Sequence, residues 1–218
     1  MAQHLQREIE QLKKKILALG ATVEDRVRKA VDAVERRDVQ LAAVIIRGDK
    51  EIDQLEVDLE EDCLKILALH QPVAIDLRFI VAVLKINSDL ERVGDLAVNM
   101  AERAELLGAW PQILMPFEMI ALSEKSQAML RRSLDSLVKF DAAAAREVCQ
   151  MDDEVDTINR QTYDLVKDAL RTHPEHVGVL IAYLSVSRYL ERIADHATNI
   201  AEDVIYMTEG VIARHGAP

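Results

Sequence analysis

The chain carries one acidic helical run twice. Residues 90–104 read LERVGDLAVNMAERA, and residues 190–204 read LERIADHATNIAEDV. The two runs match at a shift of 100 residues, and the acidic segments that precede them match at a shift of 103, so that Asp49 corresponds to Asp152. A repeat on this scale is the sequence signature of a duplicated structural unit. We therefore expect a fold built from two similar halves.

Composition and apolar periodicity indicate that each half is helical. Apolar residues make up 50% of the 218 residues but aromatic residues only 4%, with 7 glycines and 5 prolines. Between residues 5 and 23, apolar side chains recur at alternating steps of four and three, as along the buried stripe of an amphipathic helix. The sequence predicts an all-α protein of two tandem, similar three-helix bundles, 1–109 and 110–218. The six predicted helices span about residues 5–36, 38–69, 74–107, 116–139, 141–171 and 174–208, the second with Asp38 as its N-cap.

The charge balance excludes two classes of partner. The chain has 27 Lys and Arg against 38 Asp and Glu, a formal net charge of −11, which repels nucleic acid and anionic membrane surfaces. We expect no nucleic-acid binding. The first residues lack the apolar core of a signal peptide, and no uncharged apolar stretch reaches the length of about 18 residues that a membrane span needs. We therefore expect a cytoplasmic protein without membrane insertion.

Acidic residues four positions apart recur at matched places in both halves. Residues at this spacing lie on one face of a helix, so each pair presents two carboxylates side by side. In an antiparallel arrangement, the pairs on the second and third helices of each half lie at the same height and face each other. The four pairs are Asp49 with Asp53, Glu91 with Asp95, Asp152 with Asp156, and Glu191 with Asp195.

Carboxylates that converge between helices need a cation. Four of them cannot all stay ionised together unless a positive charge neutralises them. Oxygen donors suit hard ions such as iron, manganese, magnesium or calcium, and we include zinc among the candidate metals. Asn99 and Asn199 continue the acidic faces and are weaker candidates for supporting hydrogen bonds. Arg92 and Arg192 point to another side of their helices and are expected to be flanking charges.

Other interpretations of these residues remain open. Acidic pairs at this spacing also occur on solvated helix faces, although four pairs in two copies favour metal binding. A metal-dependent hydrolase and a purely structural helical adaptor are the alternative functions. His173 and His176 flank a proline and fit a solvated loop, and the chain lacks the Glu-x-x-His pattern of ferritin-like di-iron proteins. The sequence contains no recognisable catalytic motif, so we expect that the protein is not an enzyme.

Two segments closely resemble the signature of the PhoU family, accessory regulators of bacterial phosphate uptake. The first is QPVAIDLRFIVAVLKINSDLERVGDLAVNMAE at residues 71–102, and the second is YLSVSRYLERIADHATNIAEDV at residues 183–204. The resemblance extends over about residues 5–208. It implies two similar three-helix bundles whose acidic pairs, here the four pairs named above, hold multinuclear metal clusters. The segment RTHPEHVG at residues 171–178 departs from the family pattern, so a role of Asp76 and Arg78 is not carried over to the second half.

The resemblance also implies a function and partners. The protein would be a negative regulator of the phosphate-starvation response. It would link the ATPase subunit of a phosphate ABC transporter to a phosphate sensor histidine kinase. We further expect the chain to form a homodimer.

Overall fold

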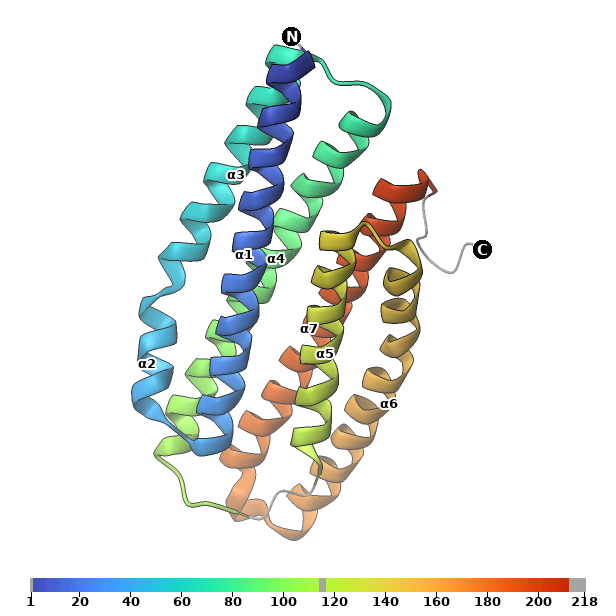
Figure 1. Cartoon of the computed structure of the whole chain (residues 1–218). Coiled ribbons are helices and arrows are strands. Elements are labelled where there is room, and N and C mark those ends of the chain that lie inside the picture. Colours follow the sequence, from blue (N-terminus) through green and yellow to red (C-terminus); the bar gives the residue numbers. More distant parts are fainter. Residues whose placement is uncertain (1, 114–116, 212–218) are drawn as a thin grey trace.

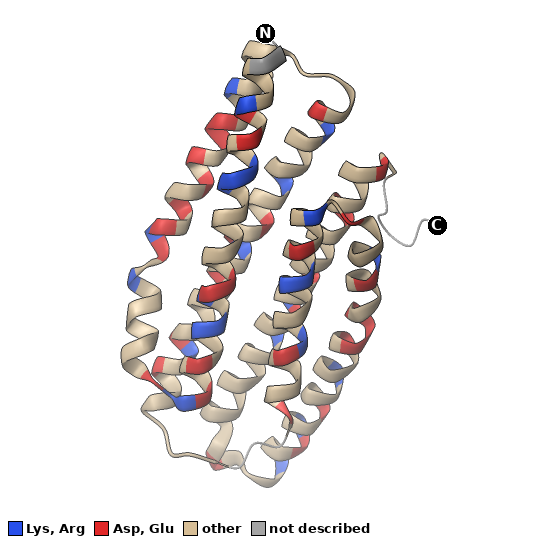
Figure 2. Ribbon diagram, in the orientation of Figure 1, with Lys and Arg blue, Asp and Glu red and all other residues tan. Residues whose placement is uncertain are grey.

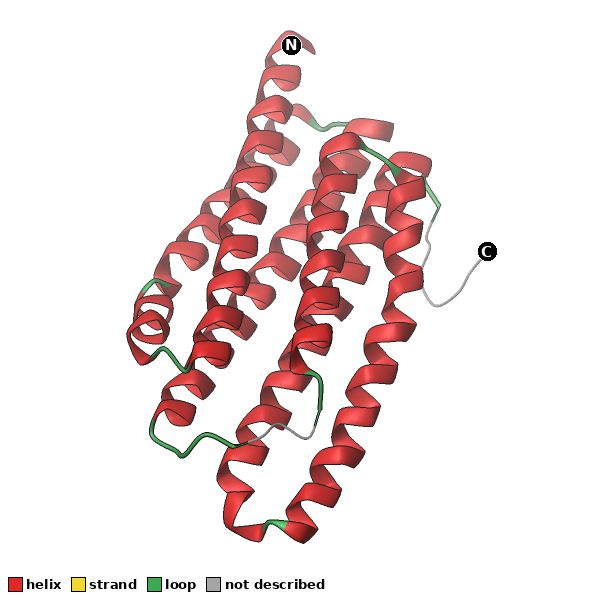
Figure 3. Ribbon diagram, turned by 60° about the horizontal axis from the view of Figure 1, so that its bottom comes forward, coloured by secondary structure: helices red, strands yellow, loops and turns green. Residues whose placement is uncertain are grey.

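The computed structural model describes residues 2–113 and 117–211, which form helices and connecting loops but no strand (Figure 3). The all-α prediction is confirmed. The helices are α1 (Ala2–Arg36), α2 (Val39–Arg47), α3 (Asp49–His70), α4 (Ala74–Gly108), α5 (Met119–Lys139), α6 (Ala142–Thr172), a short 3₁₀ helix (Pro174–His176) and α7 (Val177–Glu209). The predicted helix start at Pro116 lies outside the described residues. In the part of the chain that the structure describes, no helix combines the length and apolar character needed to cross a membrane.

The helices form an elongated bundle with two halves side by side (Figure 1). α1, the α2–α3 pair and α4 make up one half, and α5, α6 and α7 make up the other. The contact between α4 and α7 is the most extensive of all helix pairs, and α1 also contacts α5. The buried apolar side chains form one continuous cluster through both halves. The predicted division at residue 109 falls directly after α4, but the two halves share one core.

The same turn precedes the second helix of each half. Arg37 and Phe140 both adopt a left-handed conformation with φ 53°. The Asp that follows each of them caps the next helix. The Asp38 carboxylate accepts hydrogen bonds from the backbone N–H groups of residues 40 and 41, and Asp141 does the same for residues 143 and 144. The predicted N-cap at Asp38 is confirmed.

The single helix predicted over residues 38–69 is wrong in one respect, because the structure breaks it at Gly48. α2 ends before this residue and α3 begins after it. The Arg26 side chain, only 7% exposed, reaches from α1 and donates a hydrogen bond of 2.6 Å to the Gly48 carbonyl. A buried guanidinium needs such a partner. In the second half the corresponding residues are Met129 and Met151, and α6 continues without a break.

Gly94 allows α3 and α4 to approach closely. A methyl group at this position would lie 3.0 Å from Cδ1 of Ile52, tighter than an ordinary contact. The corresponding pair in the second half is Ala194 and Val155, both fully buried. One half therefore combines a glycine with a large partner, whereas the other combines an alanine with a smaller one.

This exchange of volume predicts that the two positions are coupled. Gly94→Ala should gain helix propensity of about 1 kcal/mol, but the contact with Ile52 should cancel much of that gain. In an Ile52→Val background the gain should be recovered, with a favourable coupling of about 0.5–1.5 kcal/mol. Urea unfolding of the wild type, both single variants and the double variant measures this coupling. Effects that add within about 0.3 kcal/mol would contradict the exchange.

Candidate metal centres

The structure brings the predicted carboxylates of the first half together. Asp49 is the first residue of α3, Asp53 lies one turn further on, and Asp95 faces them from α4. One carboxylate oxygen from each of these three lies within 4.8 Å of the other two. Glu91 lies one turn before Asp95. Burial raises the pKa of Glu91, and the charges of Asp95 and Asp53 raise it further. The two acidic pairs thus meet between α3 and α4. Figure 2 shows acidic residues spaced along α3 and none on α2.

The electrostatics of this first centre favour a bound cation. Burial raises the pKa of Asp49, and the charge of Asp53 adds to the effect while Arg26 opposes it. Burial also raises the pKa of Asp95, followed by the charges of Asp49 and Asp53. Arg26 Nη1 lies 3.5 Å from Asp49 Oδ1 and offsets only part of the negative charge. A metal ion would remove the remaining repulsion.

The four predicted residues of the second half also influence one another. Burial is the largest cause that raises the pKa of Asp152, Glu191 and Asp195, and the charge of Asp156 raises all three further. Asp195 in turn raises the pKa of Asp152 and Glu191. Within the described residues, however, Asp152, Asp156 and Asp195 do not reach the 4.8 Å spacing of their counterparts. The carboxylates of the second centre are therefore more widely spaced than those of the first.

A carboxylate oxygen of the second centre has no hydrogen bond of good geometry within the part of the chain that the structure describes. Asp152 Oδ1 and Thr198 Oγ1 are both buried, and neither has a hydrogen-bond partner among the described residues. Burial raises the pKa of Asp152, and the nearby Thr198 hydroxyl opposes part of that rise without reaching good hydrogen-bond geometry. A buried carboxylate oxygen without a donor is unfavourable and fits coordination to a cation. This observation supports the assignment of metal-ligating residues made from the sequence.

The two centres have different surroundings, although the repeat predicts equivalent ones. Arg26 borders the first centre, and its counterpart in the second half is Met129. Thr198 borders the second, and its counterpart is Val98. Burial raises the pKa of Asp195, and His196 opposes part of that rise. The first centre therefore has a buried guanidinium beside it at a place where the second half has a methionine.

The weaker candidates lie at the edge of the centres. Asn199 donates a hydrogen bond of 3.3 Å to Asp89 on α4, so its amide nitrogen is engaged across the α4–α7 contact. Asn99 is half-buried on α4. The supporting role of the two asparagines stays a prediction. Arg92 and Arg192 are exposed, which agrees with the predicted flanking position. Burial raises the pKa of Glu91 and of Asp195, and the neighbouring arginine opposes part of that rise in each case.

Glu56 is a member of the first centre that the pair pattern misses. Its charge raises the pKa of Glu91, and burial raises its own pKa. It follows Asp53 by three residues and so lies on the same face of α3, a spacing that could have revealed it. Its counterpart, Asn159, instead accepts a hydrogen bond of 2.8 Å from Ser187. The first centre thus has a fifth carboxylate, and the second has an amide at this place.

Comparison with known proteins agrees with this duplicated arrangement. The model of the PhoU domain matches residues 16–104 and again residues 119–204. The chain belongs to the PhoU family. A phosphate-specific transport system accessory protein PhoU homolog from Aquifex aeolicus is 38% identical over 209 residues, which are 96% of this chain and 95% of the relative. A corresponding homolog from Pseudomonas aeruginosa is 36% identical and is covered to 89%.

Two crystal structures of PhoU proteins share the fold. PhoU from Pseudomonas aeruginosa superimposes with a TM-score of 0.91 at 35% identity, covering 94% of this chain and 99% of the other. The phosphate transport system regulatory protein PhoU from Streptococcus pneumoniae gives a TM-score of 0.83 at 28% identity, covering 95% and 98%. Both halves of the bundle are therefore part of the family fold.

The raised pKa values predict how pH acts on the metal-free protein. Asp95 and Asp195 bind protons more readily in the folded state than in the unfolded chain. Their contribution to the free energy of unfolding should therefore fall as pH rises from about 4 through the raised pKa values. With chelator at pH 7, Asp95→Asn and Asp195→Asn should leave the free energy of unfolding unchanged or raise it by at most about 1 kcal/mol, since solvent screens these exposed groups. Urea unfolding between about pH 4.5 and 7.5 tests this.

A control of opposite sign comes from α6. Glu154 is exposed, and a hydrogen bond from Lys125 lowers its pKa. Glu154→Gln should therefore remove a contribution to the free energy of unfolding that grows as pH rises. If Asp95→Asn and Glu154→Gln change the pH dependence in the same direction, the carboxylates of the first centre do not repel each other as described.

Proposed function

We propose that this chain is a metal-binding accessory protein of a phosphate-specific transport system and a negative regulator of the phosphate-starvation response. The observation that carries the proposal is the PhoU-domain match to both halves, together with relatives of nearly equal length that are named as accessory proteins of such systems. The similar structure from Streptococcus pneumoniae is that of a phosphate transport system regulatory protein, which supports the same role.

In this proposal each half holds metal ions between its second and third helices. In the first half the metal ligands would be Asp49, Asp53, Glu91 and Asp95. In the second half they would be Asp152, Asp156, Glu191 and Asp195. All the donors are carboxylates, which favour iron, manganese or magnesium, with zinc as a further candidate. Bound cations would neutralise the carboxylates and hold α3 against α4 and α6 against α7.

The protein would act by docking rather than by catalysis. Its partners would be the ATPase subunit of the phosphate ABC transporter and the phosphate sensor histidine kinase, and it would work in the cytoplasm as a homodimer. Exposed apolar side chains at the turn between α3 and α4 support a binding role. Leu69, Val73 and Ile75 are 73%, 75% and 67% exposed, respectively, and such clustered apolar surface is typical of interaction sites.

Deletion of the gene tests the regulatory role. The phosphate-starvation genes should become active in phosphate-rich medium, because their repressor is missing, and a plasmid copy of the wild type should restore repression. A transcriptional reporter for a starvation-induced promoter measures this. Unchanged reporter activity in the deletion strain would contradict the assignment.

Metal analysis tests the two centres. The wild type, purified without chelator, should contain bound metal, and Asp95→Asn and Asp195→Asn should each lower the metal content by removing one centre. In the metal-loaded state both substitutions should also lower the melting temperature, because a bound ligand stabilises the folded state by mass action. Glu154→Gln is the matched control and should keep the full metal content. Metal-free wild type, or equal metal in all four proteins, would favour solvated acidic faces.

A further inference from the structure

A cluster with different chemistry lies at the end of the molecule where α1 begins and α3 ends (Figure 1). His4 and Glu8 are four residues apart on α1 and so share one face, and His70 is the last residue of α3. Nε2 of His70 lies 2.6 Å from Oε2 of Glu8, and Nδ1 of His4 lies 3.6 Å from Oε1 of Glu8. One potential ligand atom from each residue lies within 4.8 Å of the other two.

The central carboxylate of this cluster is paired with the two histidines, but not through a hydrogen bond of good geometry to Oε2. Oε2 of Glu8 is buried and has no hydrogen-bond partner of good geometry among the described residues. His70 is close to it, but the two atoms do not meet the geometry of a hydrogen bond. The side chains of Glu8 and His70 are only 28% and 15% exposed, whereas His4 is 71% exposed. The cluster therefore has two sheltered ligands and one that opens to solvent.

We propose that His4, Glu8 and His70 form a zinc site, separate from the carboxylate centres. Two imidazole nitrogens and one carboxylate oxygen are typical zinc ligands, with water in the fourth position. Bonds of about 2.0–2.1 Å place tetrahedral ligands about 3.3 Å apart, so the observed separations need only small side-chain movements. The exposed His4 side chain is free to make most of this adjustment.

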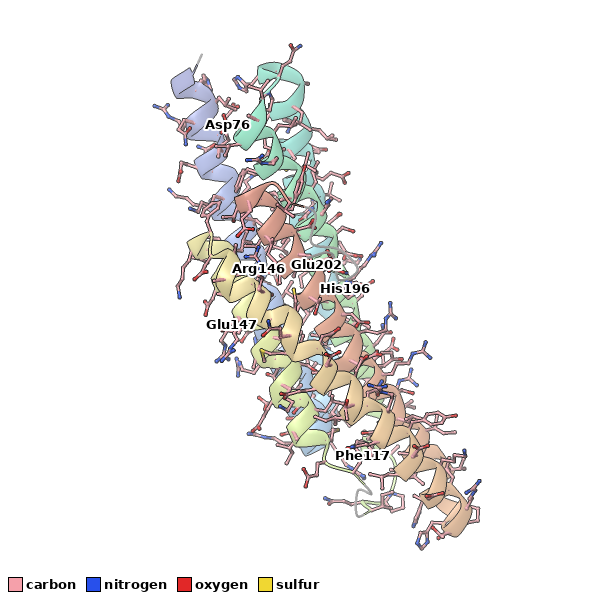
Figure 4. The ribbon with its side chains drawn as sticks, turned by 90° about the vertical axis from the view of Figure 1, so that its right-hand side faces the viewer. Asp76, Phe117, Arg146, Glu147, His196 and Glu202 are labelled. Atoms are coloured by element: carbon pink, nitrogen blue, oxygen red, sulfur yellow. The ribbon has the colours of Figure 1, made fainter. Side chains whose placement is uncertain are left out.

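Bound zinc would tie the start of α1 to the end of α3. These residues are 66 positions apart, from residue 4 to residue 70, and belong to different helices. The turn between α3 and α4 begins directly after His70, and Asp76 near the start of α4 lies toward this same end of the molecule (Figure 4). The site would therefore fix the helix ends that flank the exposed apolar residues of this turn.

Cobalt(II) replaces zinc as a spectroscopic probe, because tetrahedral Co²⁺ absorbs visible light much more strongly than octahedral Co²⁺ in an all-oxygen centre. The intact wild type should show the tetrahedral bands at one equivalent of Co²⁺, and Zn²⁺ should abolish them. His4→Gln and His70→Gln should lose the bands and bind Zn²⁺ more than about tenfold more weakly in competition with a chromophoric chelator. Because His4 is exposed, its substitution leaves the core intact.

His173→Gln provides the matched control. His173 is 61% exposed, and its Nδ1 lies 3.2 Å from Oε1 of Glu175, so it is another histidine beside a carboxylate. This variant should keep the tetrahedral bands and the Zn²⁺ affinity of the wild type. Bands that persist in His4→Gln, or that disappear in His173→Gln, would place the metal elsewhere. If the wild type shows no tetrahedral bands, the cluster is only a His70–Glu8 ion pair and the proposal is wrong.

Discussion

The contact between α4 and α7 is the constraint on which the rest of the structure depends. It is the most extensive helix contact in the molecule and the seam along which the two halves share one core. Polar contacts cross it at Asp89 and at Asp203. Nδ1 of His196 lies 2.8 Å from Oδ1 of Asp89, and Lys85 donates a hydrogen bond of 2.9 Å to Asp203. His196 lies partway along α7, well away from its ends (Figure 4). Removal of one partner of a buried pair is strongly destabilising, so the buried pair of His196 and Asp89 helps to fix the register of the seam.

The same two helices carry half of the candidate metal ligands. α4 presents Glu91 and Asp95 to α3, and α7 presents Glu191 and Asp195 to α6. The seam therefore sets where the two centres lie relative to each other. Ordering of the carboxylates by metal would act directly on the helices that join the halves.

Much of this fold follows from local patterns in the sequence. The apolar periodicity marks the long helices, and Asp38 marks a helix start because capping involves only the next few residues. The meeting of Asp49 and Asp53 with Asp95 follows from helix geometry and the position of one turn. The break at Gly48 could not be predicted in this way, because the Gly48 carbonyl accepts a hydrogen bond from Arg26, which lies on another helix. The cluster of His4, Glu8 and His70 was not predicted from the sequence, because His70 comes to the pair on α1 from the end of α3.

Divergence between the repeats also limits prediction from the sequence. The duplicated pattern predicts two equivalent centres, yet Arg26 and Glu56 border only the first, and Thr198 only the second. These differences come from residues outside the repeated acidic pairs. Under the proposed function, these differences predict that the two centres would bind metal with different affinities.

Anomalous X-ray scattering from crystals grown with Mn²⁺ tests the central claim most directly. The account predicts anomalous peaks within bonding distance of the carboxylates of Asp49, Asp53 and Asp95, and a second group of peaks beside Asp152 and Asp195. The peaks should disappear at the matching centre in Asp95→Asn and Asp195→Asn crystals. Density maps without anomalous peaks at either centre, at saturating Mn²⁺, would contradict the claim that the paired acids of this chain hold metal.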